Sequence, residues 1–534
     1  MSDRQLMSGN EAAALGARHV GCVRGTGYPG TPSTEILEHF SRIGGSAAWS
    51  PNEKVAAEVA LGVAMAGGRA MTTMKHVGLN VASDVLYTAA YSTIPGSLVF
   101  IVADDPGLAS SQNEQDTRRH AIAAGVPVLD PADPQEAYDF TRLAFQIAAR
   151  WHLPVIVRLT TRVSHTAAAV APRTPDDPPA TRFERDIPGR VMVPGHARPA
   201  HRALRQKLEE VRAWNEAEGP QRIYEGTSRR GIVANGVACL HAREADPRAS
   251  VFKVGMSHPA PIRAILDFLK DKDEAFVVEE NDPVLAEAIR AEGGRVPWNP
   301  PSFRRGELTV GRVRRLLAGE PEPETPAGAG QPPRLCPSCP HGYVFDLFRR
   351  VDCIVAGDIG CYTLAALPPR RAMDTQLCMG ASIGVGLGLR HALPEPEARR
   401  VVSVIGDSTF MHSGLTGVAE MVYNPPPTGH VLVVLDNAIT AMTGRQEHPG
   451  SGYALNHAPA HQIRIEDVCR AMGVPVVEVF DPVREMNGLE SALRRALGAS
   501  HVSVLIARRP CLLSPSRERA ASASKPKACA GEGA

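Results

Sequence analysis

GDSTF at residues 406–410 and LDNAITAMTGRQ at residues 435–446 decide the fold of the last third of this chain. Each stretch begins at the end of an apolar run, VVSVI or HVLVV, and we expect both runs to be neighbouring parallel strands. Because the carboxyl ends of parallel strands meet at one edge of a sheet, Asp407 and Asn437 should converge there. A carboxylate, an amide oxygen and a nearby main-chain carbonyl form an oxygen ligand set that suits Mg²⁺ on a diphosphate. The two stretches therefore predict an α/β domain with a metal–diphosphate site.

Composition limits the classes of protein to consider. A chain of 534 residues should hold about three or four domains. Its 58 lysines and arginines nearly balance 57 aspartates and glutamates, so charge gives no support to nucleic-acid binding. The amino-terminal segment lacks the basic and apolar regions of a signal peptide, and no apolar run approaches the roughly 18 residues of a membrane span. We therefore expect a cytoplasmic protein with no nucleic-acid and no membrane partner.

Three proline-rich seams, at residues 171–182, 296–303 and 319–333, mark domain boundaries, because such runs favour extended and weakly packed backbone. Before the first seam, helical patterns alternate with apolar strands, which is typical of a doubly wound α/β domain. Residues 202–219 predict a charged, exposed helix, and three strand-like runs follow it. The predicted parts are a first α/β domain (1–175), a helical linker (176–225), a smaller α/β domain (226–318), a Pro/Gly linker (319–333), a second parallel-sheet domain (334–515) and a disordered tail (516–534).

The ten cysteines show no regular framework, which in a chain of this length argues for reduced thiols and against a secreted disulfide scaffold. Cys336 and Cys339 form a Cys-x-x-Cys pair that can grip a metal centre, and Cys361 and Cys511 can add ligands from distant loops. Zinc and a [4Fe-4S] cluster use similar ligands. Iron–sulfur is favoured because GDIGC and ARRPC each follow a predicted strand and so lie near the diphosphate edge. The alternative, capping turns with core cysteines, stays open on the residues alone. We expect packing roles for Cys22, Cys239, Cys353, Cys378 and Cys469.

In the first domain, GTGYPGTPSTEIL (25–37) places glycines and the hydroxyl groups of Thr31, Ser33 and Thr34 ahead of an amphipathic helix. Free amides and hydroxyls there can hold a carboxylate, and the alternative is an ordinary helix cap. Further on, Glu53 opens a helix of small residues. A glutamate in a first turn is normally a partner of the helix dipole. Gly62, nine residues later, indicates a helix suited to close packing.

Several motifs together give a specific resemblance. YPGTPSTE, MKHVGLN, DDPG with SSQNEQDTR (Asp104 to Arg118), CPxCPH and GDSTFMHSG extend over roughly the first 515 residues. In this combination the chain resembles the large, thiamine-binding subunits of indolepyruvate ferredoxin oxidoreductases, in the 2-oxoacid:ferredoxin oxidoreductase superfamily. The resemblance implies a pyrimidine-binding domain at 1–175, a transketolase C-terminal-like domain at 226–318 and a diphosphate/Mg-binding domain at 334–515.

The resemblance also implies roles for individual residues. Glu53 matches the catalytic glutamate that hydrogen-bonds the aminopyrimidine of thiamine diphosphate, and Lys75 and His76 lie in the catalytic segment that faces the thiazolium. Thr31 matches the threonine that meets the substrate carboxylate. The remaining matches are Asp407, Asn437 and the carbonyl of Ile439 for Mg²⁺; Gly380, Gly406 and Ser408, with His412 as a further candidate, for the diphosphate; and Cys336, Cys339, Cys361 and Cys511 for a [4Fe-4S] cluster.

The implied activity is oxidative decarboxylation of aryl 2-oxoacids, of the indolepyruvate or phenylpyruvate type, to acyl-coenzyme A. Electrons would leave through the cluster to ferredoxin or another carrier. A small partner subunit is implied too, in a homodimer or heterotetramer. Two alternatives remain: a non-redox thiamine diphosphate-dependent decarboxylase or carboligase, which needs no converging thiols, and a non-catalytic assembly subunit, which would not bind the cofactor tightly.

The chain departs from the family pattern at two places. Related large subunits usually continue into a ferredoxin-like domain with repeated Cys-x-x-Cys runs, whereas only Cys529 follows Cys511 here. We therefore expect the onward electron route to pass through a partner or a directly docked carrier. The second departure is CPSCPHG, where the family commonly has glycine between the cysteines and arginine after the histidine. Gly342 stands in this chain where the family has that arginine, whereas the thiols remain.

Overall fold

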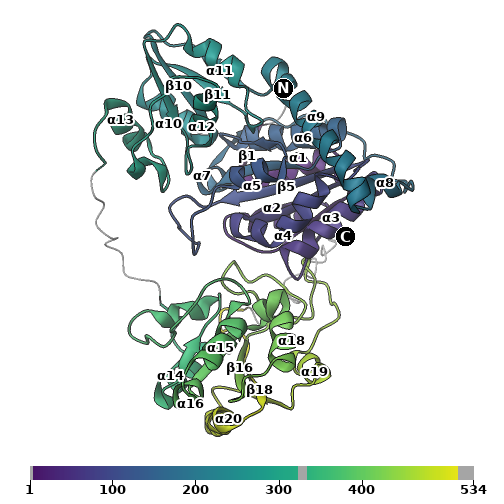
Figure 1. Ribbon diagram of the computed structural model, residues 1–534, viewed down its shortest axis with the longest axis vertical. Helices are drawn as coiled ribbons and strands as arrows, with labels where there is room; N and C mark the ends of the chain where they lie inside the picture. The colour runs from purple at the N-terminus through teal and green to yellow at the C-terminus, as the bar shows by residue number, and fades with distance from the viewer. Residues whose placement is uncertain (1–3, 323–333, 515–534) are drawn as a thin grey trace, which may run out of the picture. The chain divides into compact units, whose positions relative to one another are not determined.

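The computed structural model describes residues 4–322 and 334–514. Contacts divide the chain into two compact units, residues 1–329 and 330–534, and each unit is described by itself (Figure 1). Most of the predicted linker at 319–333 and all of the predicted tail at 516–534 lie outside the described residues.

A seven-stranded sheet forms the centre of the first unit. All neighbouring strands pair in parallel except the first two, which are antiparallel. The inner strands are apolar and buried along their length, as expected for a parallel sheet covered on both faces. In spatial order the strands are β12 (Met256–His258), β6 (Val128–Leu129), β7 (Val155–Thr160), β5 (Ser97–Asp104), β4 (Arg69–Lys75), β2 (Arg24–Gly27) and β3 (Ala47–Trp49).

Two groups of helices cover this sheet, which makes it doubly wound. In Figure 1, α1 and α6 lie on one side of β5, and α3 and α4 lie on the other. The first group packs together as α1 (Gly9–His19), α2 (Thr34–Arg42) and α6 (Pro134–Trp151), and the second as α3 (Glu53–Met65), α4 (His76–Ala89) and α5 (Thr117–Ala124). Smaller elements are the antiparallel pair β1 (Gln5–Ser8) and β8 (Ala167–Val170), with α7 (Thr161–His165) and α8 (Ile187–Arg190).

The charged helix predicted at 202–219 lies within α9 (Pro194–Glu218), but it is not exposed all round. Leu204, Leu208 and Val211 are buried, and so is Asn215. Nδ2 of Asn215 donates to two main-chain carbonyls, those of residues 256 and 259. The expectation of an exposed helix was therefore wrong for one face, because leucine and valine recur there at helical spacing.

A four-stranded sheet follows within the first unit, with three parallel strands and one antiparallel edge strand. Separate apolar clusters cover its two faces. Its strands, in spatial order, are β13 (Glu274–Val278), β10 (Arg230–Asn235), β11 (Ser250–Val254) and β9 (Arg222–Tyr224). The helices are α10 (Gly236–Ala245), α11 (Ile262–Leu269), α12 (Val284–Ala291), α13 (Val310–Ala318) and the 3₁₀ turn η1 (Pro301–Arg304). The strand β9 lies in the predicted linker, and β12, from the predicted smaller domain, joins the larger sheet. The sheets therefore do not follow the predicted domain boundaries residue by residue, and those boundaries stay predictions.

A buried arginine joins the two sheets of the first unit. The guanidinium of Arg118 contacts Asp116 and Glu279, each at 2.6 Å, and all three side chains are almost wholly buried. Next to it, the half-exposed Arg119 pairs with Asp282 and Glu287. The segment that contains Arg118 therefore fixes the edge of the first sheet against the loops that follow β13.

The second unit contains a five-stranded sheet in which every pair is parallel. In spatial order its strands are β14 (Ile354–Ala356), β15 (Val401–Gly406), β16 (His430–Asp436), β18 (Val502–Arg508) and β17 (Val476–Phe480). The helices are α14 (Pro340–Val351), α15 (Ala381–Ala392), α16 (Glu395–Ala398), α17 (Asp407–Thr409), α18 (Leu415–Tyr423), α19 (Ile465–Ala471) and α20 (Met486–Gly498), with the 3₁₀ segment η2 (Cys361–Ala366) and the π-helical turn η3 (Phe410–Gly414). The predicted adjacency of VVSVI and HVLVV is confirmed, since β15 and β16 are parallel neighbours.

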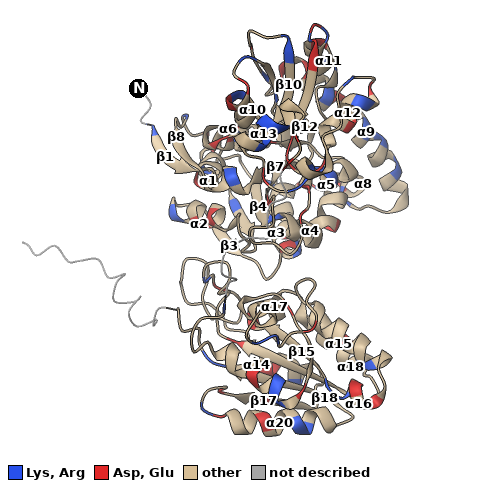
Figure 2. Ribbon diagram, turned by 90° about the vertical axis from the view of Figure 1, so that its left-hand side faces the viewer, with Lys and Arg blue, Asp and Glu red and all other residues tan. Residues whose placement is uncertain are grey.

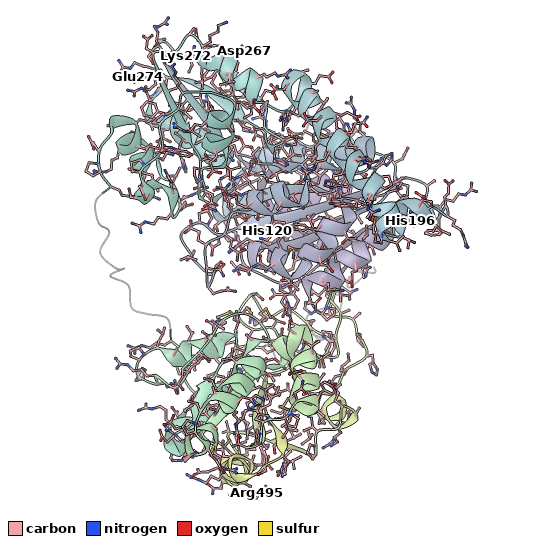
Figure 3. The ribbon with its side chains drawn as sticks, viewed as in Figure 1. His120, His196, Asp267, Lys272, Glu274 and Arg495 are labelled. Atoms are coloured by element: carbon pink, nitrogen blue, oxygen red, sulfur yellow. The ribbon has the colours of Figure 1, made fainter. Side chains whose placement is uncertain are left out.

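Charged residues of both signs occur in both units. Basic and acidic positions are interspersed along the ribbons (Figure 2), and Figure 3 shows Arg495 at the outer side of α20. Among the helices of the described residues, none is long and apolar enough to cross a membrane.

Candidate functional site

The carboxyl ends of β15 and β16 bring Asp407 and Asn437 into neighbouring loops. Oδ2 of Asp407 accepts the N–H of Ala438, the residue after Asn437, at 2.6 Å. Oδ1 of Asn437 accepts the N–H of Ile439 at 3.0 Å. The hydroxyl of Thr440 donates to Oγ of Ser408 at 2.9 Å, which ties the two loops a second time. A buried carboxylate and an amide oxygen are therefore close together, and this donor chemistry fits Mg²⁺.

His448 adds a histidine to this loop pair that the sequence analysis missed. Its Nε2 atom lies 3.3 Å from Oδ2 of Asp407, and both side chains are buried. Burial opposes ionisation of Asp407, but His448, the N–H of Ser408 and His341 together more than offset it, so the pKa of this carboxyl is lowered. The pKa of His448 is raised, since Asp407, with smaller contributions from Asp436 and Glu447, outweighs the effect of burial. Burial and the charge of Asp407 raise the pKa of Asp436 to about 6, although Arg508 opposes the shift. No pattern in GRQEHPG singled out His448, because its partner is 41 residues earlier.

Gly380 lies where the chain turns into α15 with a positive φ of 87°, and a Cβ atom there would come 2.4 Å from Cβ of Ser413. Ser413 in turn hydrogen-bonds Nδ1 of His412, so Gly380 and His412 belong to one neighbourhood. The carboxylate of Asp358 accepts the N–H groups of Gly380 (2.9 Å) and Ser382 (3.0 Å). Burial raises the pKa of Asp358, and these N–H groups oppose the rise. The contribution of Gly380 to a diphosphate site stays a prediction.

The four candidate cysteine ligands lie near one another. Burial, and then the neighbouring Cys339, Cys511 and Cys336 in that order, together raise the pKa of Cys361 to about 11. Cys339 occupies the N-cap position of α14; burial raises the pKa of its thiol, and the N–H groups of His341 and Gly342 oppose the rise. Four soft donors in one neighbourhood fit an iron–sulfur or zinc centre in kind. In the described ranges, however, no three His, Cys, Asp or Glu side chains are arranged to hold a metal ion.

The remaining cysteines of the described chain differ in exposure. Cys22, Cys239 and Cys469 are buried, as expected for packing residues, and Cys353 is half-buried. Cys378 is exposed, two residues before Gly380, so the expectation that it packs in the interior was wrong. The extended segment before Gly380 keeps it at the surface.

In the first unit, Glu53 is the first residue of α3 and is only 5% exposed. Asn52 caps this helix by accepting the N–H of Val55, so Glu53 is not the cap. A Cβ atom built on Gly78 would come 2.4 Å from Oε1 of Glu53, which shows how closely α4 approaches the carboxylate. The helix α3 packs against α4, as expected of a helix suited to close packing, but Gly62 itself has no neighbour within 4 Å of a Cβ atom. The close approach to Glu53 is made by Gly78 of α4.

Lys75 and Thr31 lie together beside the loop that follows β5. The stem of Lys75 lies 3.1 Å from where a Cβ atom of Gly30 would be, and its ammonium donates to the carbonyl of Ser110 at 3.0 Å. The hydroxyl of Ser110 donates to the carbonyl of Thr31 at 3.3 Å. Burial lowers the pKa of Lys75, while Asp105 and then Glu53 oppose the decrease. A partly buried cation thus lies within the field of Glu53.

The other predicted residues of this region have defined partners. Nε2 of the buried His76 lies 3.1 Å from the carbonyl of Asn113. The hydroxyl of Ser33 donates to the carbonyl of Gly30, and Oγ1 of Thr34 accepts the N–H of Gly30. Neither hydroxyl makes the cap of α2, so the ordinary-cap alternative was wrong for these side chains.

Asp105 is a second residue whose role the sequence analysis did not identify. Its carboxylate accepts hydrogen bonds from the side chains of Ser111 (2.6 Å) and Thr161 (2.8 Å) and from the N–H of Ser110 (2.8 Å). Asp105 therefore shapes the loop that contacts Lys75 and Thr31. In the sequence, the only indication of this role was that Asp105 belongs to the motif DDPG.

Comparisons with known proteins match both units. Residues 15–218 match a family model described as "Pyruvate flavodoxin/ferredoxin oxidoreductase, thiamine diP-bdg", and residues 358–507 match "Thiamine pyrophosphate enzyme, C-terminal TPP binding domain". Indolepyruvate oxidoreductase subunit IorA of Archaeoglobus fulgidus is 38% identical over 97% of this chain and 88% of its own length. The subunit IorA of Thermococcus kodakarensis is 37% identical over 96% of this chain and 86% of its own.

A solved structure supports the fold. The 2-oxoglutarate:ferredoxin oxidoreductase from Magnetococcus marinus, with 2-oxoglutarate, coenzyme A and succinyl-CoA bound, aligns with a TM-score of 0.50 at 19% identity. The alignment covers 60% of this chain and 65% of that one. The α/β sheets described above are therefore of the thiamine diphosphate-binding type.

Proposed function

The chain belongs to the family of IorA subunits of indolepyruvate oxidoreductase, which are thiamine diphosphate-dependent 2-oxoacid oxidoreductases, and we propose the finer features of its reaction. The proposed substrates are aryl 2-oxoacids of the indolepyruvate or phenylpyruvate type, converted to acyl-coenzyme A. The proposed electron route is a [4Fe-4S] cluster and then ferredoxin or another carrier. The loops that follow β15 and β16, which contain Asp407 and Asn437, are the proposed metal–diphosphate loops. The supporting observation is that the segments containing the four clustered thiols form hydrogen bonds with these loops. A non-redox decarboxylase has no use for that arrangement.

The residues present fit the cofactor at each end. Glu53, which is buried and closely approached by Gly78, would hydrogen-bond the aminopyrimidine and hold its proton. Asp407, Asn437 and the carbonyl of Ile439 would hold Mg²⁺ on the diphosphate, with Gly380, Gly406 and Ser408 beside it. When bound, thiamine diphosphate supplies an electron sink at the carbonyl carbon of the substrate.

Residues of the first unit would bind and orient the substrate. Thr31 is proposed to meet the substrate carboxylate, and the ammonium of Lys75 to attract the same negative charge. Burial strengthens such an attraction, because a partly desolvated cation interacts more strongly with an anion. His76, fixed by the carbonyl of Asn113, is proposed to shape the neighbouring surface.

The partners follow from the proposed reaction. Cys336, Cys339, Cys361 and Cys511 would hold the cluster. A small oxidoreductase subunit is proposed as a separate polypeptide, because the relatives are named as subunits. The assembly is proposed to be a cytoplasmic homodimer or heterotetramer.

Anaerobic purification with the small subunit tests the proposal. The expected product is a brown protein with about four irons per chain, the content of one [4Fe-4S] cluster, and bound thiamine diphosphate. It should reduce a one-electron dye only when an arylpyruvate and coenzyme A are both present. A colourless protein that releases aldehyde without reducing the dye would support the non-redox alternative, and a protein that binds no cofactor would support the assembly subunit.

A further inference from the structure

The segments that contain the thiols are hydrogen-bonded to the metal–diphosphate loops of the second unit. His341 lies two residues after Cys339, and its Nε2 atom accepts a hydrogen bond from Nδ2 of Asn437 at 3.2 Å. The hydroxyl of Tyr362, directly after Cys361, accepts the N–H of Gly406 at 2.9 Å.

The third thiol-containing segment makes the same kind of connection through its main chain. The N–H of Cys511 donates to the carbonyl of Asn437 at 3.2 Å. Asn437 is thus held on its main chain by one cysteine segment and on its side chain by another. A displacement of either cysteine segment would therefore alter a contact of this residue.

His341 and Tyr362 form one packed element. Both are almost wholly buried, and their rings meet edge to face with centroids 5.9 Å apart. The ring of Tyr362 also stacks on Phe345 at 6.3 Å, and its hydroxyl donates to the carbonyl of Ile359 at 3.1 Å. Closely packed rings with satisfied polar atoms transmit a displacement because they have few alternative arrangements.

The orientation of the Asn437 amide depends on this element. Its Nδ2 atom faces His341, so Oδ1 faces the N–H of Ile439 on the side of the metal–diphosphate loops. Without an acceptor at His341, the amide keeps only the contact of Oδ1 with the N–H of Ile439 to fix its orientation.

We propose that His341 and Tyr362 are positioning residues that couple the four-cysteine site to the metal–diphosphate site, so that filling the first tightens Mg²⁺ and thiamine diphosphate in the second. The inference rests on the proposed function, which assigns a cluster to the thiols. Thermodynamic linkage makes the coupling reciprocal: Mg²⁺ and thiamine diphosphate must also slow the loss of metal from the thiols or favour its uptake.

Calorimetric titration of one anaerobic preparation tests the coupling. Half of the protein keeps its iron, a chelator strips the other half, and both are titrated with Mg²⁺ and thiamine diphosphate. The iron-containing protein should bind Mg²⁺ and thiamine diphosphate about tenfold more tightly than the stripped protein, within the range typical of coupling between two sites. The difference should return when iron and sulfide are restored, and iron release to the chelator should be slower with Mg²⁺ and thiamine diphosphate present.

Two variants and one control assign the coupling to these residues. Tyr362→Phe removes one hydroxyl but keeps the stacked ring, so the fold should survive, as circular dichroism will show. In Tyr362→Phe and in His341→Ala, the affinities of filled and stripped protein should become equal. His391→Ala, at an exposed histidine in the last turn of α15, should behave as wild type.

Each contrary result overturns a defined part of the proposal. Equal affinities in filled and stripped wild-type protein overturn the coupling, and a difference that survives in both variants overturns the roles of His341 and Tyr362. Equal weakening of both states by the variants shows a purely structural role and also overturns those roles. Wild-type protein that contains no iron or never binds thiamine diphosphate contradicts the proposed function itself.

Discussion

Gly78 and Glu53 approach so closely that a Cβ atom on the glycine would lie 2.4 Å from the carboxylate oxygen Oε1. Gly78 lies in the first turn of α4 and Glu53 is the first residue of α3, and these two helices pack together on one face of the first sheet. Only glycine leaves the carboxylate in its observed position.

Gly78→Ala should displace the Glu53 carboxylate while the protein stays folded. The atoms that must move, Oε1, Cδ and Cγ, all belong to the flexible Glu53 side chain. Alanine also gains about 1 kcal/mol of helix propensity over glycine, which offsets part of the crowding. Turnover should therefore fall sharply with little change in unfolding temperature. Gly62→Ala is the matched control, because that glycine lies in α3 with nothing within 4 Å of its Cβ position. Loss of turnover in both variants would contradict a steric effect specific to Gly78.

Glu53→Gln should retain thiamine diphosphate but lose most turnover. Glutamine keeps the shape of the side chain, but it cannot share a proton with the aminopyrimidine. The expected loss is about 10²- to 10⁴-fold, the usual contribution of a general acid–base group. Dye reduction with an arylpyruvate measures turnover, and calorimetry measures cofactor affinity. Unchanged turnover would refute the role assigned to Glu53.

Arg118→Met should destabilise the first unit far more than Arg119→Met. Arg118 is fully buried, so its loss leaves Asp116 and Glu279 as buried, poorly compensated charges. Such a loss typically costs about 3–5 kcal/mol. Arg119 is 40% exposed, and exposed ion pairs contribute about 0–1 kcal/mol each. Denaturant unfolding of both variants measures the difference, and similar losses would contradict the importance of burial.

Glu280→Gln should stabilise the protein at pH 8 but not at pH 5. Glu280 is buried and accepts the N–H of Leu308 at 2.9 Å. Burial raises its pKa from 4.5 to about 7, although Arg158 opposes the rise. Between these values the folded state binds a proton that the unfolded state releases, so this group's contribution to stability falls as pH rises toward 7.

Above pH 7 the ionised Glu280 costs about 3 kcal/mol, since each pKa unit corresponds to about 1.4 kcal/mol. Glutamine resembles the protonated form and can still accept the N–H of Leu308, so it removes that cost. Thermal unfolding from pH 5 to pH 8 tests the expectation. Parallel curves for the variant and wild type would show that Glu280 does not titrate in this range.

The strands and the positions of Asp407 and Asn437 were predictable because they depend on local patterns. An apolar run that ends in a polar residue specifies both a buried strand and the side chain at its carboxyl end. The structure confirms that β15 and β16 are parallel neighbours. The assignment of catalytic and ligand roles to individual residues stays a prediction.

The contacts around these residues were not predictable in the same way. His448 lies beside Asp407 because two loops meet in space, and nothing in GRQEHPG indicates that partner. The burial of one face of α9 was also missed, because charged residues outnumber the few leucines and valines that pack.

The sequence alone determined the family, the α/β class and the polar residues that follow β15 and β16, since strand periodicity and motif spacing are properties of the linear chain. Tertiary structure alone decided that Gly78 lies against Glu53 and that His341 and Tyr362 join the thiols to Asn437 and Gly406. Those contacts join residues 25 to 96 positions apart, and only the packing of helices and strands brings them within hydrogen-bonding distance or van der Waals contact.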